Sequence, residues 1–123
     1  MSEDDVTFQG CQFWTAFEVA DLRFWRSALY RRYFEQLDRH GGFYYDHWGD
    51  APVHTLAASL FLPLSQLHLF EDVGYQHASY GRCPTEESLH TSGGCVCNIE
   101  SENFDDSHLG CLERWKRESK GRI

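Results

Sequence analysis

The segment from Gly41 to His54, GGFYYDHWGDAPVH, combines ionisable side chains with large aromatic rings between two glycines and a proline. A buried strand would be more uniformly apolar, and a solvated loop would carry fewer rings. The mixture is typical of a lined cavity in which rings form walls and polar groups do the chemistry. The polar candidates are Asp46, Asp50 and His54, and the candidate walls are Phe43, Tyr44, Tyr45 and Trp48. The alternative is an aromatic-rich turn that covers a hydrophobic edge.

Two further residues are suited to chemistry elsewhere in the chain. Glu18, in AFEVA, offers a carboxylate, and His77, in GYQH, offers an imidazole. Taken alone, each has an ordinary interpretation, because an acid before a helix and a histidine in a loop are usually solvated. His54 would equally satisfy a hydrogen bond in the core of a helix, and Tyr44, Tyr45 and Trp48 would equally be packing residues.

The composition limits the classes of function. The chain has 123 residues, which suits one domain with one hydrophobic core. Its formal charge is -8, with 19 acidic against 11 basic side chains, which argues against a nucleic-acid partner and a polybasic membrane patch. The longest apolar run, residues 56–64, is far shorter than the about 20 residues that span a bilayer. The first ten residues open with acids and do not form a signal peptide.

Five cysteines in so short a chain favour an oxidising compartment, and their odd number leaves one thiol without a partner within the chain. Four of them fall in the last third, where Ser, Gly, Asn and Asp are frequent and periodicity is weak. We expect an irregular segment held by disulfides, with a free-thiol, partly disordered tail as the alternative. A zinc site is a further alternative, although Cys-x-Cys is not the usual ligand spacing. Its ligands would be Cys83, His90, Cys95, Cys97 and Cys111.

The first half of the chain predicts one extended segment and one helix. Gln12 to Val19 is short and aromatic, which suits a strand or an extended approach to the following helix. Asp21 can cap that helix, and Gly41 and Gly42 can end it. Apolar residues at steps of three and four predict that one stripe of the helix faces the core. The stripe consists of Leu22, Trp25, Leu29, Tyr33 and Leu37.

A second helix is predicted over Asp50 to Leu62, with its first residue as the cap and Pro52 in its first turn. Because this helix is nearly all apolar, we expect it to be buried. Gln66 to Phe70 is interpreted as a strand that leads into a loop, Glu71 to Tyr80, carrying His77. The alternation of strands and helices predicts an α/β fold.

The segment from Cys11 to Pro84 resembles the fungal alpha-1,2-mannosyltransferases of glycosyltransferase family 15, Golgi enzymes that extend O-linked and N-linked mannose chains. The motifs FW-x-x-FE, FWRS, GGFYY, WGDAPVH and GY-x-H stand in the family's order and spacing. The tail is looser but similar, with CVC, NFD and a cysteine shortly before Arg114 and Trp115. Several independent motifs over more than half of the chain are far more specific than one short pattern.

The resemblance implies a partial GT-A type α/β fold, GDP-mannose as donor, a manganese ion on its diphosphate, and transfer with retention to a mannose 2-hydroxyl of an acceptor glycan. Glu18 matches the family's nucleophile or stabilising carboxylate, a group that lowers the barrier at an oxocarbenium-like carbon. Asp50 matches an active-site acid, and His77 matches the metal-binding histidine, whose nitrogen suits manganese. Double displacement and a front-face reaction both stay open. The implied substrate contacts are Tyr44, Tyr45, Trp48 and His54.

Family members also carry a membrane anchor, a stem and a first catalytic half with a Glu-Pro-Asp motif, and none of these occurs in this sequence. We therefore expect a non-matching segment at 1–10, the C-terminal half of the catalytic domain at 11–84, and its irregular cysteine-containing tail at 85–123. The implied location is the lumenal side of the Golgi membrane. We expect a mannosyltransferase fragment that is inactive in isolation. The alternative is a non-catalytic, disulfide-stabilised carbohydrate-binding remnant.

Overall fold

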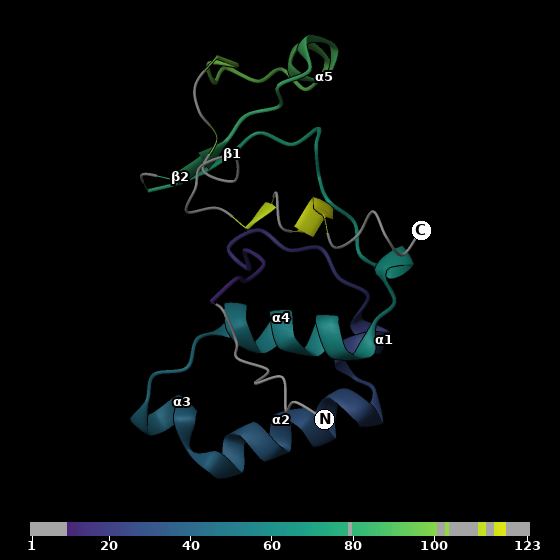
Figure 1. Cartoon of the computed structure of the whole chain (residues 1–123), viewed down its shortest axis with the longest axis vertical. Coiled ribbons are helices and arrows are strands. Elements are labelled where there is room, and N and C mark those ends of the chain that lie inside the picture. Colours follow the sequence, from purple (N-terminus) through teal and green to yellow (C-terminus); the bar gives the residue numbers. More distant parts are fainter. Residues whose placement is uncertain (1–9, 79, 101–102, 104–110, 113–114, 118–123) are drawn as a thin grey trace, which may run out of the picture. The chain divides into compact units, whose positions relative to one another are not determined.

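The structure is a computed structural model that describes residues 10–78, 80–100, 103, 111–112 and 115–117. The chain divides into two compact units, Met1–Pro63 and Leu64–Ile123, whose helices and strands are labelled in Figure 1. Apart from Gly10, the expected N-terminal segment 1–10 lies outside the described residues, and so does part of the tail from residue 85.

The first unit contains two helices where the sequence predicts one. Helix α1 covers Leu22–Trp25 and helix α2 covers Ala28–His40. Asp21 caps α1 as predicted, with its carboxylate accepting from a backbone amide of the first turn. The single-helix prediction is wrong because Ser27 adopts an extended backbone, with ψ 153°, and its hydroxyl accepts from the Tyr30 amide at 3.1 Å. A serine bonded to the backbone in this way starts a new helix.

Helix α2 ends as predicted, at Gly41, which adopts a left-handed conformation with φ 75°. Glycine reaches this conformation without a steric penalty, and the short helix α3, Gly42–Tyr45, follows directly. The predicted apolar stripe is not buried along its length. No residue of α2 is buried, and Leu22 and Leu29 are 56% and 52% exposed.

Helix α4, Asp50–Phe61, lies within one residue of its predicted bounds. The predicted cap is wrong, since Gly49 occupies the N-cap position and Asp50 is the first helical residue. A carboxylate is still favourable there because it faces the positive end of the helix dipole. The burial prediction holds only in part: the middle of α4 is buried, but Leu60 near its end is 67% exposed. The buried members of α4 are Val53, Thr55, Ala57 and Ala58.

Helix α4 lies alongside α2 in the first unit (Figure 1). The Tyr33 hydroxyl donates to the Val53 carbonyl at 3.0 Å, and its ring meets the Phe61 ring edge-on at 5.7 Å between centroids. One tyrosine of α2 therefore joins the two helices by both a polar and an aromatic contact. The extended segment predicted at residues 12–19 forms neither a strand nor a helix in the structure. It contacts α4 through the hydrogen bonds described below.

The second unit holds a 3-10 turn η1, Leu64–Gln66, a hairpin of β1, Tyr75–His77, and β2, Tyr80–Arg82, and helix α5, Glu87–Ser92. The strand predicted at residues 66–70 is wrong. The Leu67 amide bonds the Leu64 carbonyl at 3.0 Å, which closes a turn, and a strand needs a neighbour to pair with. The predicted loop at 71–80 instead contains β1, which pairs antiparallel with β2, His77 opposite Tyr80.

The described residues thus form a mixed helix and strand structure with one two-stranded antiparallel sheet. The α/β prediction is right that both element types occur. The regular strand and helix alternation on which it depended is absent from the described ranges, because two of the predicted strands are irregular segments.

The tail is held by a disulfide, as predicted, between Cys83 and Cys97, whose Cα atoms are 5.9 Å apart. Cys11 and Cys111 are disulfide-bonded as well, and Cys95 is a free thiol. The zinc alternative is therefore wrong for this structure. A cysteine binds zinc as a thiolate, and four of the five cysteine sulfurs are engaged in disulfides instead.

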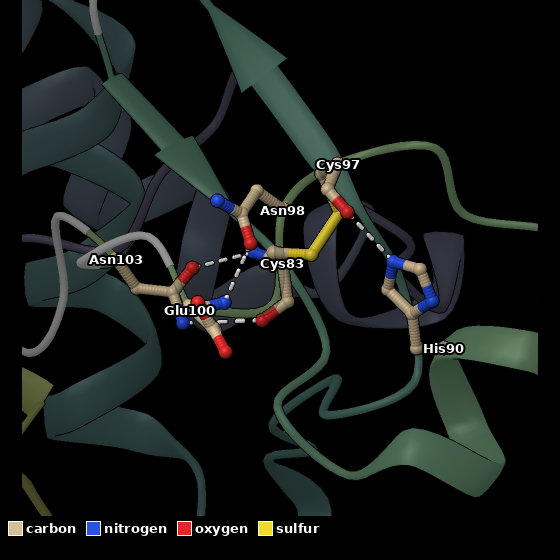
Figure 2. The surroundings of a disulfide bond; sticks show 6 residues. All are labelled: Cys83, His90, Cys97, Asn98, Glu100 and Asn103. Carbon is tan, nitrogen blue, oxygen red and sulfur yellow. Dashed lines mark hydrogen bonds between the residues drawn. A yellow bond between two sulfur atoms is a disulfide. The ribbon is translucent and has the colours of Figure 1, made fainter.

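Figure 2 shows how the surroundings of this disulfide are closed by polar contacts. The Asn103 side chain accepts from the Cys83 amide at 2.5 Å and donates to the Cys83 carbonyl at 3.1 Å. His90 donates from Nε2 to the Cys97 carbonyl at 2.7 Å. Asn103 and Cys83 are only 5% and 4% exposed, so the backbone N–H and C=O of Cys83 need partners within the protein. The Asn103 amide supplies both, as a neighbouring strand would.

Candidate functional site

The segment of residues 10–21 is attached to helix α4 by three polar contacts. The Phe13 amide donates to Thr55 Oγ1 at 2.8 Å. The side chain of Thr15 hydrogen-bonds the Asp50 carboxylate. Glu18 bonds a histidine of the same helix, as described next. Backbone without regular structure gains a defined conformation from such side-chain anchors.

The third contact joins Glu18 to His54, which are 36 positions apart in the chain. Oε2 of Glu18 lies 2.8 Å from Nδ1 of His54, and the two side chains are 28% and 31% exposed. Since a carboxylate oxygen accepts, Nδ1 carries the proton in this contact. The His54 ring also stacks on Trp25 of α1, with 4.4 Å between centroids and 29° between planes. Two predicted site residues are therefore in direct contact.

Asp50 lies one helical turn before His54 on α4, so both face the same side of the helix. The hydrogen bond from Thr15 is the main reason that the pKa of Asp50 lies below its ordinary value, and the charge of His54 and two backbone amides lower it further. Burial acts in the opposite direction but is outweighed. Asp50 is thus an ionised anchor in this structure, with its carboxylate already engaged.

The Glu18 carboxylate also affects the nearby Tyr30 hydroxyl. The pKa of Tyr30 lies above its ordinary value, first because of burial and second because of the charge of Glu18. Two carboxylates and one imidazole thus lie together in the first unit, near a phenol whose neutral form is favoured. We call Glu18, Asp50 and His54 the α4 cluster.

The predicted wall residues lie around α3. Tyr44 and Tyr45 are 68% and 83% exposed, and the Tyr44 hydroxyl donates to Asp38 at 2.9 Å. The Trp48 ring packs over Gly42, whose hydrogen points at the indole, and meets Phe43 edge-on at 6.0 Å. Trp48 therefore has a packing role in the structure, while the two tyrosines present their rings to solvent. Their predicted contact with substrate stays a prediction.

His77 is exposed on strand β1 of the second unit, beside the hairpin turn. Its role as a metal ligand stays a prediction. Among the described residues, the group of three possible ligand residues within reach of one ion is Cys83, His90 and Cys97, whose ligand atoms lie within 4.8 Å of one another. Its two sulfurs form the disulfide, so this group is closed to a metal as long as the bond is intact.

The second unit also contains a cavity of about 150 Å³. Its lining includes two cations, Arg82 and Lys116, and two carboxylates, Glu71 and Glu86. The charges balance, so the cavity does not by itself select an anion or a cation. Sequence reasoning assigned none of these four residues to a functional site.

A sequence model of the family described as "Glycolipid 2-alpha-mannosyltransferase" matches residues 1–120. The chain belongs to this family. The match starts at residue 1, so it includes the segment that sequence reasoning separated at 1–10. It also includes the whole α4 cluster, the α3 aromatic residues and His77.

Three curated fungal relatives illustrate the similarity. Glycolipid 2-alpha-mannosyltransferase 1 of Candida albicans is 52% identical over 109 residues, which is 89% of this chain and 25% of the relative. Glycolipid 2-alpha-mannosyltransferase of Saccharomyces cerevisiae is 47% identical over 110 residues, 89% of this chain and 25% of the relative. O-glycoside alpha-1,2-mannosyltransferase homolog 3 of Schizosaccharomyces pombe is 48% identical over 105 residues, 85% of this chain and 28% of the relative. The chain thus spans about a quarter of the length of the relatives that it matches.

Sequence reasoning missed the roles of three residues that build the site. Thr15 and Thr55 anchor the segment to α4, and Trp25 supports the imidazole. Thr55 did carry a signal, since it is a polar residue in a helix that is otherwise mainly apolar. Trp25 was assigned to the core stripe, and no local pattern distinguishes a ring that packs on a histidine from one that packs on leucine.

Proposed function

We propose that this chain forms part of the active site of a retaining alpha-1,2-mannosyltransferase that transfers mannose from GDP-mannose to the 2-hydroxyl of an acceptor mannose. The observation that carries the proposal is the partly exposed Glu18 carboxylate, held at a defined position by α4 in a chain that belongs to a mannosyltransferase family. The relatives named above carry alpha-mannosyltransferase activity in their names. A GT-A type fold is part of the same proposal.

Glu18 is the residue to which we assign the reacting face of the donor sugar. When the bond to the diphosphate breaks, positive charge develops on the anomeric carbon and the ring oxygen. A carboxylate beneath that carbon stabilises the charge electrostatically or forms a bond to it. Both routes give retention when the acceptor hydroxyl attacks from the face that the diphosphate leaves, and both require an ionised Glu18 with one oxygen turned toward the sugar.

Asp50 has two compatible roles in this proposal. It fixes Thr15 and so holds the backbone three residues before Glu18, and it adds a second negative charge on the same side of α4. The exposed rings of Tyr44 and Tyr45 would pack against the apolar faces of sugar rings, as tyrosines commonly do at carbohydrate surfaces.

His77 is the residue that we assign to a manganese ion on the donor diphosphate. Its imidazole is exposed on β1, and imidazole nitrogen beside oxygen ligands suits manganese. A bound manganese ion would neutralise the departing diphosphate. The remaining ligands would be phosphate oxygens and further acids. Among the described residues, no acid forms a three-ligand group with His77.

We place the protein in the secretory pathway, on the lumenal side of the Golgi membrane. Disulfides at Cys83 and Cys97 and at two further cysteines suit an oxidising compartment. None of the described helices has the length and hydropathy needed to cross a bilayer.

The test is a chimera in which this chain replaces the matching part of the Candida albicans relative, assayed for mannose transfer from GDP-mannose to a mannoside. We expect an alpha-1,2-linked product, formed with retention of the donor's anomeric configuration. Glu18→Gln should lower kcat roughly 10²- to 10³-fold, the usual cost of losing one group that stabilises transition-state charge. Glu35→Gln, an exposed acid on α2, is the matched control and should have no effect.

A manganese titration of the same chimera tests the second assignment. His77→Ala should raise the manganese concentration needed for half-maximal rate, while His68→Ala in the same unit should not. If the chimera binds mannosides but transfers nothing, even with saturating manganese, the carbohydrate-binding alternative replaces the transferase proposal.

A further inference from the structure

His54 is fixed from two directions before any ligand is present. Its backbone belongs to α4, one turn after Asp50, and its ring is stacked on Trp25 of α1 at 4.4 Å. An imidazole that stacks on an indole and whose backbone is part of a helix has few side-chain rotamers available. Its Nδ1 atom therefore points in one direction, and Glu18 Oε2 lies there at 2.8 Å.

Glu18, by contrast, belongs to a segment with no helix or strand of its own. A glutamate side chain has three rotatable bonds and loses about 1.5 to 2 kcal/mol of rotamer freedom when it is fixed. Its neighbours Phe17 and Val19 are 45% and 72% exposed, so packing beside it does little to restrain it. Among the residues that the structure describes, His54 is the hydrogen-bond partner that restrains this carboxylate.

The contact engages one carboxylate oxygen, Oε2, and the side chain is 28% exposed. Oε1 is thus the oxygen with which Glu18 can approach a sugar. The hydrogen bond needs a proton on Nδ1, and both the imidazolium and the neutral Nδ1-protonated tautomer carry one. Two carboxylates lie near the ring, Glu18 at hydrogen-bond distance and Asp50 one helical turn before His54 on α4.

We propose that His54 is a positioning residue for Glu18 and that Trp25 in turn sets the orientation of the imidazole. The inference rests on the proposed function, and it differs from the sequence prediction, which placed His54 in contact with substrate. A carboxylate that must sit beneath an anomeric carbon gains from such a support, because a displacement of about 1 Å can cost roughly a hundredfold in rate.

Two substitutions separate the parts of this arrangement. His54→Phe keeps a ring for Trp25 and removes the donor. His54→Asn removes the ring and keeps an N–H close to the place of Nδ1. A positioning role through the hydrogen bond predicts that the asparagine variant stays close to the native protein and that the phenylalanine variant does not. His40→Phe, at the end of α2, is the control for the added apolar ring.

The first readout uses the purified 123-residue chain and does not depend on activity. In the native chain, NMR couplings of the Glu18 side chain should report one fixed rotamer, and the His54 nitrogen shifts should report a proton on Nδ1. In His54→Phe the Glu18 couplings should become averaged, and in His54→Asn they should stay those of one rotamer. A Glu18 side chain that is equally fixed in His54→Phe would overturn the inference.

The second readout is the chimera described above. His54→Phe should lower kcat roughly tenfold to a hundredfold, the range expected for a lost hydrogen bond to a charged group, with little change in KM. His54→Asn should recover most of that loss, and His40→Phe should match the native chimera. A rise in KM at unchanged kcat would overturn positioning in favour of direct substrate contact. If the native chimera is inactive, the proposed function fails, and the NMR couplings decide the positioning role by themselves.

Discussion

Thr55→Val tests whether the segment carrying Glu18 depends on its anchors to α4. Thr55 is 7% exposed, and its Oγ1 accepts from the Phe13 amide at 2.8 Å. Valine has nearly the same shape and a similar helix propensity, so the substitution removes the acceptor while preserving the volume. The Phe13 amide then loses this acceptor in a partly covered position.

The expected magnitude follows from that geometry. A neutral hydrogen bond contributes about 1 kcal/mol net, and a donor left without its partner in a fully buried place costs about 1 to 3 kcal/mol. Phe13 is 36% exposed, so water can reach part of the site and the lower end applies, about 1 to 1.5 kcal/mol. That free energy corresponds to a roughly tenfold larger population of the detached segment.

Amide hydrogen exchange at Phe13 measures this population directly. We expect roughly tenfold faster exchange in Thr55→Val. Thr55→Ser is the matched control, since it keeps the hydroxyl and loses only a methyl group, and its Phe13 exchange should stay close to native. Unchanged exchange in the valine variant, or equal acceleration in both variants, would refute the view that this hydrogen bond anchors the segment.

Three further predictions concern other parts of the chain. Gly42→Ala places a Cβ atom 2.2 Å from the Trp48 indole, so the ring must move. The midpoint of urea unfolding should fall by an amount equivalent to about 1 to 3 kcal/mol in the free energy of unfolding. An unchanged midpoint would contradict the packing of Trp48 on Gly42. Asn103→Ala removes both partners of the Cys83 backbone and should cost about 2 to 4 kcal/mol, with faster exchange of the Cys83 amide, whereas continued protection of that amide would exclude the proposed clamp. Asp21 has its pKa lowered from 3.8 to about 2 by the adjacent guanidinium, so its stabilising contribution is complete above pH 3.8 and disappears as the pH falls through about 2; a carboxyl titration by NMR with a midpoint near 3.8 would refute this pairing.

The α4 cluster shows where sequence reasoning succeeded and where it stopped. Asp50 and His54 were named as site residues from their residue types among aromatic rings, and Glu18 was named through the family resemblance. Their contacts were not predicted. Glu18 and His54 are 36 positions apart, and no local pattern specifies that one accepts a hydrogen bond from the other.

The predicted helices and strands likewise fall into those that the structure confirms and those that it does not. The end of α2 at Gly41 and the bounds of α4 were predicted almost to the residue, because glycine, proline and helix caps act within one turn of where they stand. The break at Ser27 was missed, since the apolar period continues across it while the serine hydroxyl bonds the backbone. The strand at 66–70 was wrong because a strand exists only with a neighbour to pair with.

Sequence alone therefore determined the family, the end of α2, the bounds of α4 to within one residue, and Glu18, Asp50 and His54 as chemically capable residues. These depend on residue identity, motifs and short-range backbone geometry. Tertiary structure alone decided that His54 faces Glu18, that Asp50 is an anchor bonded to Thr15, and which two tail cysteines, Cys83 and Cys97, are joined. The physical reason is distance along the chain. These contacts join residues that are far apart in sequence, and they form only when packing has brought the segments together.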